Sequence, residues 1–300
     1  MRRIATTIAV ATVVVAAGAM AGGVPALAAS HGATATTASS FYLSLGDSLA
    51  QGVQPNAQGK NVETKQGYPD QLFTALRLGN PTLKLVKLGC PGETTGTMIN
   101  GGICTYSLGS QLKQAAAFLH NHRGHVQLVT IDIGANDLNP CLVLTNLNDI
   151  VKCLQGVFPT IQANLTTIMD TLTTASGSGH PPIIGMAYYD PQLANWLKGT
   201  PADKTLAKDS VALAQGFNSL LGGVYKAFGS KVADVFTAFH TAAPFKVRVT
   251  LPAFGSVPKA VGYICMYTWM CAAPPVGPNI HANQLGYGVI ANTFLNTYLG

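Results

Sequence analysis

The segment FYLSLGDSL at residues 41–49 joins an apolar run directly to a polar turn. Residues 41–45 are aromatic or aliphatic except for one serine, which predicts a short β-strand. Gly46, Asp47 and Ser48 follow at once and favour tight turns. We therefore expect Ser48 at the carboxyl end of the first strand, on a turn that exposes its hydroxyl. Taken alone, these residues are also typical of an ordinary turn.

Strand-like and helix-like runs alternate along the rest of the chain. Further strands are predicted at residues 83–88, 126–133, 182–188 and 231–236. Apolar residues at helical spacing predict helices at residues 67–78, 107–120, 147–174, 204–228 and 284–299. Because parallel neighbours need right-handed crossovers, this order predicts an α/β fold, a three-layer α/β/α sandwich with a central five-stranded parallel sheet.

Residues 237–283 interrupt this alternation and are rich in proline, glycine and aromatic residues. They are interpreted as a long functional loop. Trp269, Met270 and the apolar residues of 245–254 form either an acyl pocket or lid, or a small core of the loop itself. Residues 188–191 are either part of the pocket wall or a simple exit from a strand.

The N-terminus has the pattern of an export signal. Two arginines and an apolar run precede a small-residue cleavage pattern at residues 26–28. We expect a signal peptide over residues 1–29, cleaved near Ala28 or Ala29, and a secreted protein. A retained membrane anchor is the alternative.

One domain is expected over residues 41–300, after a disordered lead-in at residues 30–40. The formal net charge of the 300-residue chain is +6, and removal of the two arginines of the export signal lowers it to +4. This charge is too weak and too scattered to indicate a nucleic-acid partner.

Six cysteines in an exported chain favour three disulfides over metal ligands. The cysteines fall in three sequence clusters, which favours the local pairs Cys90–Cys104, Cys141–Cys153 and Cys265–Cys271. Other pairings remain formally possible. Zinc is the alternative, but the chain has no Cys-x-x-Cys pair and no histidine beside a cysteine at finger spacing.

Three further segments carry residue types suited to catalysis. Residues 89–95 and residues 134–137 each follow a predicted strand, where open α/β sheets place their sites. The first is a glycine turn whose backbone N–H groups are free to face an oxyanion, and the second reads Gly-Ala-Asn-Asp. Residues 278–281, Pro-Asn-Ile-His, precede the last predicted helix.

Together with residues 46–49, these segments resemble the four motif blocks of the GDSL (SGNH) hydrolase family, in the family's order. The matching residues are Ser48, Gly92, Asn136 and His281. The resemblance spans nearly the whole mature chain and implies the family's flavodoxin-like fold. It also implies a secreted serine esterase or lipase that acts on carboxylic acyl esters.

The resemblance implies a role for each matching residue. Ser48 would be the nucleophile and His281 its general base, and the reaction would pass through an acyl-enzyme. The backbone N–H groups of Ser48 and Gly92 and the side-chain amide of Asn136 would form the oxyanion hole. The protein supplies all these groups, so no cofactor is expected.

One position departs from the family pattern. The aspartate that usually stands three residues before the histidine is absent, and Pro278 occupies its place. Our hypothesis is a Ser-His dyad in which the backbone carbonyl of Pro278 accepts the Nδ1 proton of His281. An aspartate elsewhere, such as Asp190, is the alternative partner. With a carbonyl partner, the acid limb of the activity profile should fall near or below about pH 6.5.

Other polar residues are assigned lesser roles. His120, His122 and His125 suggest a metal site, but they end a predicted helix, where cationic side chains complement the helix dipole, and no metal is expected. Asp47 and Asp137 are expected to make turn and loop hydrogen bonds rather than to transfer protons.

Several rival functions remain open. A carbohydrate O-deacetylase or a phospholipase would use the same site, and a catalytically silent envelope-binding protein would keep the fold alone. An α/β-hydrolase is disfavoured because Ala50 stands where Gly-x-Ser-x-Gly requires glycine. We expect a monomer with a small-molecule or lipid ester substrate, and transient contact with a lipid surface stays open.

Overall fold

The computed structural model describes residues 40–144 and 146–300. The signal peptide predicted at residues 1–29, and all but the last residue of the lead-in predicted at 30–40, lie outside the described residues. None of the described helices is both long and apolar enough to cross a lipid bilayer.

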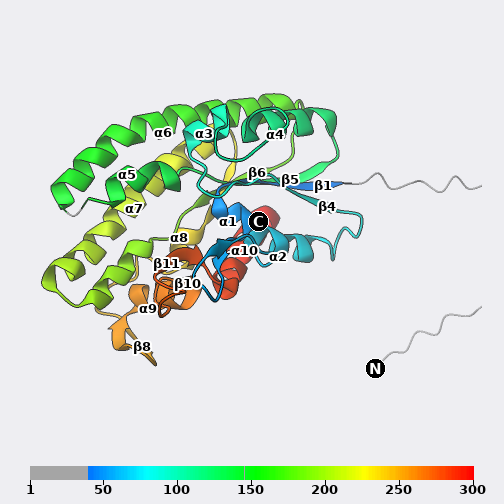
Figure 1. The fold of residues 1–300 in the computed structure, drawn as a ribbon. Coiled ribbons are helices and arrows are strands. Elements are labelled where there is room, and N and C mark those ends of the chain that lie inside the picture. The colour runs from blue at the N-terminus through cyan, green and yellow to red at the C-terminus, as the bar shows by residue number, and fades with distance from the viewer. Residues whose placement is uncertain (1–39, 145) are drawn as a thin grey trace, which may run out of the picture. The chain divides into compact units, whose positions relative to one another are not determined.

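Five parallel strands form the central sheet, as the sequence predicts (Figure 1). In sheet order they are β4 (Lys84–Lys87), β1 (Phe41–Gly46), β5 (Val126–Asp132), β6 (Ile183–Ala187) and β7 (Lys231–Asp234). The chain leaves β1 on one side toward β4 and then returns to β5 on the other side. Such a reversal of direction opens a crevice at the carboxyl ends of the strands, where open α/β sheets bind their ligands.

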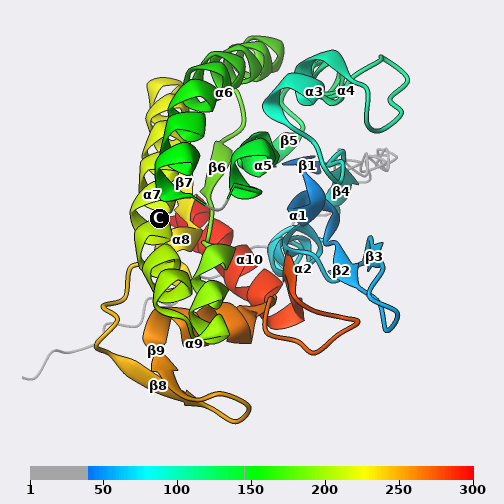
Figure 2. The same cartoon turned by 60° about the vertical axis from the view of Figure 1, so that its left-hand side comes forward.

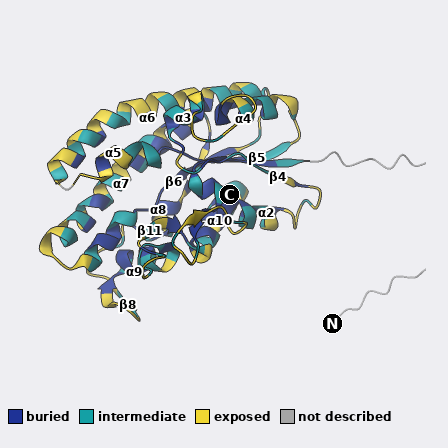
Figure 3. Cartoon of the chain, viewed as in Figure 1, coloured by how far each residue is buried: buried dark blue, intermediate teal, exposed yellow. Residues whose placement is uncertain are grey.

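The strands at this reversal are apolar because both of their faces are covered. Leu43 of β1 pairs with Val86 on one side and with Val129 on the other. Leu43 and Val129 are fully buried. Near-continuous apolar strands are the signature of parallel sheets buried on both faces. Figure 3 shows that burial is concentrated in the sheet and on the inner sides of the helices.

Helices cover both faces of the sheet and give the expected three layers. The principal helices are α2 (Tyr68–Leu76), α4 (Gln111–Asn121), α6 (Leu147–Ser176), α7 (Pro201–Ala227) and α10 (Gln284–Leu299). α4, α6 and α7 pack side by side on one face, and α2 packs against α10 on the other (Figure 1).

Capping side chains explain where two helices begin. α4 begins at Gln111 rather than at residue 107, because the Ser110 hydroxyl caps it by accepting the Lys113 N–H. α7 begins at Pro201, earlier than predicted, because Thr200 caps it and proline suits the first turn. Both boundaries follow from local hydrogen bonding rather than from apolar periodicity.

Short elements connect these parts. They are α1 (Ser48–Gln51), β2 (Gln54–Pro55), β3 (Asn61–Val62), α3 (Thr95–Asn100), η1 (Ala135–Leu138), α5 (Asn139–Leu142), η2 (Pro191–Lys198) and α8 (Val235–Ala238). η1 and η2 are turns of 3-10 helix. The described residues, 40–144 and 146–300, belong to one compact unit.

The prediction of a long loop at residues 237–283 was wrong. The segment contains β8 (Arg248–Leu251), β9 (Gly255–Pro258), α9 (Lys259–Tyr267), β10 (Thr268–Trp269) and β11 (Asn279–Ala282). β8 and β9 form a hairpin, which Figure 2 shows below α9. α9 is stable because it buries Ala260, Val261 and Ile264. The proline and glycine content of the segment hid this short apolar pattern.

The three local disulfides favoured by the sequence are the ones in the structure. They join Cys90 to Cys104, Cys141 to Cys153, and Cys265 to Cys271. All six cysteines of the chain are therefore paired. The first two disulfides fix loops next to the site described below.

Candidate active site

A strained turn presents Ser48 at the end of β1. Gly46 has φ +135°, and a Cβ atom there would lie 2.1 Å from the Asp132 carbonyl oxygen, so only glycine fits. Asp47 caps α1 by accepting the Leu49 N–H at 2.9 Å. Ser48 is consequently the first residue of α1 and is only half-buried.

His281 lies beside Ser48, although 233 residues separate them in the chain. The distance from His281 Nε2 to Ser48 Oγ is 3.0 Å. This distance allows a hydrogen bond between the hydroxyl and the imidazole. The imidazole is buried, at 7% exposed, and burial lowers the pKa of His281 from its ordinary value to about 4.

The partner of the second imidazole nitrogen differs from the hypothesis. His281 Nδ1 lies 2.7 Å from the side-chain Oδ1 of Asn279, and the hydrogen bond expected at the Pro278 carbonyl is made there instead. The physical reason is strand geometry. β11 begins at Asn279, and residues two apart in a strand project to the same side, so Asn279 and His281 face one another. The Asn-x-His spacing was the signal in the sequence that pointed to this contact.

The three residues expected around the oxyanion lie on neighbouring turns. Gly92 has φ +85°, which suits glycine, and it lies in a turn closed by a bond from the Glu93 N–H to the Cys90 carbonyl. Asn136 Nδ2 donates one proton to the Glu93 carbonyl at 2.9 Å, which leaves its second proton for another acceptor. Within the described residues, neither the Ser48 nor the Gly92 backbone N–H has a hydrogen-bond acceptor.

Gln111, which the sequence did not single out, ties the serine turn to the glycine turn. Its side chain accepts the Gly46 N–H at 2.7 Å and donates to the Gly46 carbonyl at 2.9 Å. It also donates to the Glu93 carboxylate at 3.0 Å. No motif marks this glutamine, because its role comes from the place where α4 begins.

Two buried carboxyl groups lie behind the serine turn. Asp47 accepts the Tyr188 hydroxyl at 3.0 Å, and its own N–H donates to Asp132 Oδ2 at 3.3 Å. Asp132 also accepts the Tyr68 hydroxyl. Burial raises the pKa of both carboxyls, and the neighbouring Asp47 charge raises that of Asp132 further. The sequence analysis missed Asp132, although an acid at the end of an apolar strand was the signal.

Neither of the other two nearby acids has a hydrogen bond to the imidazole. Asp137 accepts the Thr95 N–H at 2.8 Å and the Thr95 hydroxyl at 2.6 Å, joining η1 to α3. Asp190 accepts the Ser210 hydroxyl at 2.6 Å and the Gln192 N–H at 2.9 Å. Burial raises the pKa of Asp190 to about 6. Asp190 therefore caps η2, and it is not the partner of His281.

The described part of the chain holds no group of three or more histidine, cysteine, aspartate or glutamate side chains placed to bind a metal ion. Of the three histidines near the end of α4, His122 has a local role: its Nδ1 lies 2.8 Å from the Phe118 carbonyl.

A largely apolar cavity of about 320 Å³ opens at Ser48, His281 and Asn136. Its apolar wall comes mainly from η1, α5, α6 and α7, with residues Leu138, Leu142, Leu144, Ile150, Leu154, Phe158, Leu206, Leu213, Phe217 and Ile280. Tyr188, Tyr189, Asp190 and Pro191 also line it, which places residues 188–191 in the pocket wall.

The acyl pocket considered at Trp269, Met270 and residues 245–254 is not the cavity found here. Those residues do not line it. Trp269 instead donates its indole N–H to Gln54 at 3.3 Å, and Phe245 packs against Trp196. The cavity walls come from helices because α6 and α7 extend past the carboxyl ends of the strands and face each other there (Figure 2).

Comparison with known proteins places this chain in a family. The sequence model of the GDSL-like lipase/acylhydrolase family matches residues 44–289. No curated protein sequence matches the chain.

Solved structures share the fold at low sequence identity. Phospholipase A1 from Streptomyces albidoflavus NA297 is 16% identical with a TM-score of 0.55, covering 87% of this chain and 100% of its own. An extracellular lipase from Streptomyces rimosus is 17% identical with a TM-score of 0.53, covering 86% and 100%. The acetylxylan esterase Axe2 from Geobacillus stearothermophilus is 15% identical with a TM-score of 0.51, covering 86% and 94%. The family model covers most of the chain and all four motif segments, and the chain belongs to the GDSL-like lipase/acylhydrolase family.

Proposed function

We propose that this protein is a secreted serine hydrolase that cleaves carboxylic acyl esters, with Ser48 as nucleophile and His281 as general base. The observation that carries the proposal is the 3.0 Å contact between Ser48 Oγ and His281 Nε2 at the mouth of an apolar cavity. Family membership supports ester hydrolysis. Three disulfides support export to an oxidising compartment.

In the acylation step, Ser48 Oγ attacks the carbonyl carbon of the ester while its proton passes to His281 Nε2. The carbonyl π electrons move to oxygen and form a tetrahedral oxyanion. When this collapses, the bond to the alcohol oxygen breaks, and the alcohol leaves with the proton held on Nε2. Ser48 then carries the acyl group, and His281 is neutral again.

In the deacylation step, His281 Nε2 takes a proton from water, and the resulting hydroxide oxygen attacks the acyl carbon. Collapse of the second oxyanion breaks the bond to Ser48 Oγ, which takes the proton back from Nε2. The products are a carboxylic acid and an alcohol, and the enzyme returns to its starting state.

The oxyanion formed in both steps needs hydrogen-bond donors that are already in place. The Ser48 N–H, the Gly92 N–H and the second Nδ2 proton of Asn136 are proposed as these donors. Support comes from the Asn136 bond to the Glu93 carbonyl, which fixes the amide beside the Gly92 turn. Donors held rigidly in advance stabilise developing charge without reorganisation during the reaction.

The cavity favours an acyl chain of medium or greater length over acetyl. Its apolar wall gives each buried methylene about 0.8 kcal/mol, or roughly fourfold in kcat/KM, until the space is filled. An acetyl group would leave most of the wall without contact. The carbohydrate deacetylase is therefore the less favoured alternative, whereas the acyl chain of a phospholipid would fit the same wall.

Hydrolysis of p-nitrophenyl esters from acetate to palmitate tests the proposal. We expect activity to rise with chain length beyond acetate, and to fall by at least about 10⁴-fold in Ser48→Ala and in His281→Ala. Ser219→Ala and His180→Ala change the same residue types at exposed positions outside the cavity and serve as controls. A wild type no faster than the Ser48 and His281 variants would support the envelope-binding alternative, and an optimum at acetate would support the deacetylase.

A further inference from the structure

The orientation of the Asn279 side-chain amide is fixed by the backbone. The His281 backbone N–H lies 3.0 Å from the amide atom assigned as Asn279 Oδ1. A backbone N–H can only donate, so the amide atom that faces it must be the oxygen. The nitrogen then points the other way, and Asn279 Nδ2 lies 2.7 Å from Asn61 Oδ1, which accepts its proton.

This orientation fixes the tautomer of the imidazole. The same Asn279 Oδ1 lies 2.7 Å from His281 Nδ1, and because an amide oxygen only accepts, Nδ1 must carry the proton. In a neutral ring the other nitrogen is then unprotonated. Nε2 therefore presents its lone pair to Ser48 Oγ at 3.0 Å, as a general base must.

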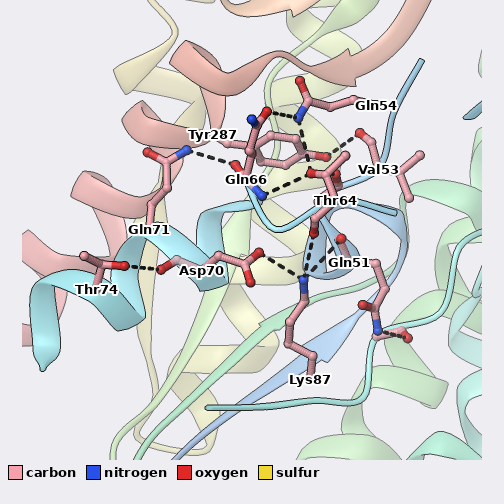
Figure 4. Close-up of polar contacts among 12 residues, drawn as sticks. Gln51, Val53, Gln54, Thr64, Gln66, Asp70, Gln71, Thr74, Lys87 and Tyr287 are labelled. Atoms are coloured by element: carbon pink, nitrogen blue, oxygen red, sulfur yellow. Dashed lines mark hydrogen bonds and ion pairs between the residues drawn. The ribbon is translucent and has the colours of Figure 1, made fainter. Parts of the chain in front are cut away.

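The loop that holds Asn61 is itself tied to the body of the protein. Lys87 Nζ donates to the carbonyls of Gln51 and Thr64, at 3.2 and 3.4 Å, and forms an ion pair with Asp70 at 3.0 Å. Figure 4 shows the Lys87 side chain at the centre of these contacts, between β4, α2 and the segment that leads to and from β3. Asn61 is exposed, but its segment is anchored on both sides.

No acid replaces the amide as partner of His281. The titratable groups on the elements around the imidazole are Asp47, Asp132, Asp190, Tyr188, Tyr189 and Tyr287. Their hydrogen bonds go elsewhere: the Tyr189 hydroxyl, for example, donates to the Ile280 carbonyl at 2.8 Å, and the Tyr287 hydroxyl to the Val53 carbonyl at 2.8 Å. The imidazole thus has a neutral partner on one side and a hydroxyl on the other.

We propose that Asn279 is the positioning residue of the Ser48–His281 pair, and that its neutral amide stands where a carboxylate would complete a charged triad. This inference rests on the proposed function. A neutral acceptor orients the ring without stabilising imidazolium. His281 then stays in its unprotonated, basic form to lower pH than it would beside a carboxylate. Because burial lowers the pKa of His281 to about 4, the acid limb of wild-type kcat/KM should lie near pH 4.

The decisive variant is Asn279→Asp. It keeps an oxygen acceptor for the backbone N–H and the Nδ1–H of His281, in a side chain of the same size, but adds a negative charge. An opposite charge at this distance favours imidazolium, so the acid limb of kcat/KM should move to higher pH by about 1 to 3 units. Gln284→Glu adds the same charge at an exposed site in the first turn of α10 and should leave the limb in place.

A second variant, Asn279→Ala, removes the acceptor. We expect kcat to fall about 100-fold from loss of ring orientation, with KM near the wild-type value. Nitrogen NMR of labelled histidine gives a measurement that does not depend on turnover: wild-type His281 should carry its proton on Nδ1 at neutral pH. If Asn279→Ala does not fold, Asn279→Asp and the NMR measurement still decide.

Two outcomes would overturn the inference: an acid limb in Asn279→Asp that coincides with wild type, or a proton on His281 Nε2 in the NMR spectrum. Its failure differs from failure of the proposed function. The latter would appear as wild-type turnover in Ser48→Ala or His281→Ala, whatever the Asn279 variants do.

Discussion

At the scale of single residues, Asn136 is the sharpest test of the proposed oxyanion hole, because one proton of its amide is donated to the Glu93 carbonyl and the proposal assigns the other to the substrate. Asn136→Ala should lower kcat by about 10² to 10³-fold. Steady-state kinetics on a p-nitrophenyl ester measure this loss. Asn148→Ala, at an exposed position of α6, is the control. A kcat within experimental error of wild type would remove Asn136 from the oxyanion hole.

The residue scale also shows where the sequence was informative. The motif segments of the sequence predict Ser48 and His281 as site residues. The structure places Ser48 Oγ 3.0 Å from His281 Nε2. The acceptor for His281 Nδ1 was assigned to Pro278 from its position in the motif. Only the register of β11, which places Asn279 on the same side as His281, selects the amide. The Asn-x-His spacing indicates this contact only once residues 279–282 are known to form a strand, and the sequence analysis did not predict that strand.

At the scale of elements, the disulfide between Cys141 and Cys153 fastens α5 to α6, and both helices supply the apolar wall of the cavity. Replacing both cysteines by alanine should loosen this wall and lower the ratio of kcat/KM for long over short acyl esters. It should also lower the free energy of unfolding by about 3 kcal/mol, because the disulfide closes a loop with a sequence separation of 12.

The matched control for this prediction is the double alanine variant of Cys265 and Cys271, which removes a disulfide with a sequence separation of 6 from a place outside the cavity lining. It should lose stability but keep the chain-length preference. Chemical denaturation and the ester series together separate the two effects. An unchanged preference in the Cys141 and Cys153 variant would show that the disulfide serves stability alone.

Element prediction succeeded in the regular alternation of strands and helices and failed in the segment rich in proline and glycine. The five strands and the helix at residues 284–299 follow from patterns that buried faces impose. α9 was missed because its nine residues follow a hairpin in a segment rich in glycine and proline. The cavity wall was also missed, because it depends on how α6 and α7 face each other beyond the sheet. No local sequence pattern specifies how two helices far apart in the chain pack together.

At the scale of the whole molecule, the buried pair Asp47 and Asp132 should influence global stability. The pKa of Asp132 lies well above the ordinary value of 3.8, chiefly because of burial, so between pH 3.8 and the folded-state pKa the native state holds a proton that the unfolded chain has lost. The free energy of unfolding should therefore fall as pH rises above 3.8. Asp132→Asn keeps an acceptor for the Tyr68 hydroxyl and cannot ionise, and should flatten this decline.

Urea denaturation at a series of pH values checks this prediction. The stability of Asp132→Asn relative to wild type should increase steadily from acid toward neutral pH. Asp170→Asn, at an exposed position on α6, is the control and should track wild type. Parallel curves for wild type and Asp132→Asn would contradict a raised pKa in the folded protein.

The separation of 233 residues between Ser48 and His281 has a consequence for the time at which the protein becomes reactive. During synthesis the serine leaves the ribosome long before the histidine exists, and it remains an ordinary alcohol until β11 docks beside α1. If our proposal for the site is right, chemical competence and completed folding arrive together. On that proposal, a chain that is still being synthesised or exported has no esterase activity and does not hydrolyse the esters of the cell that makes it.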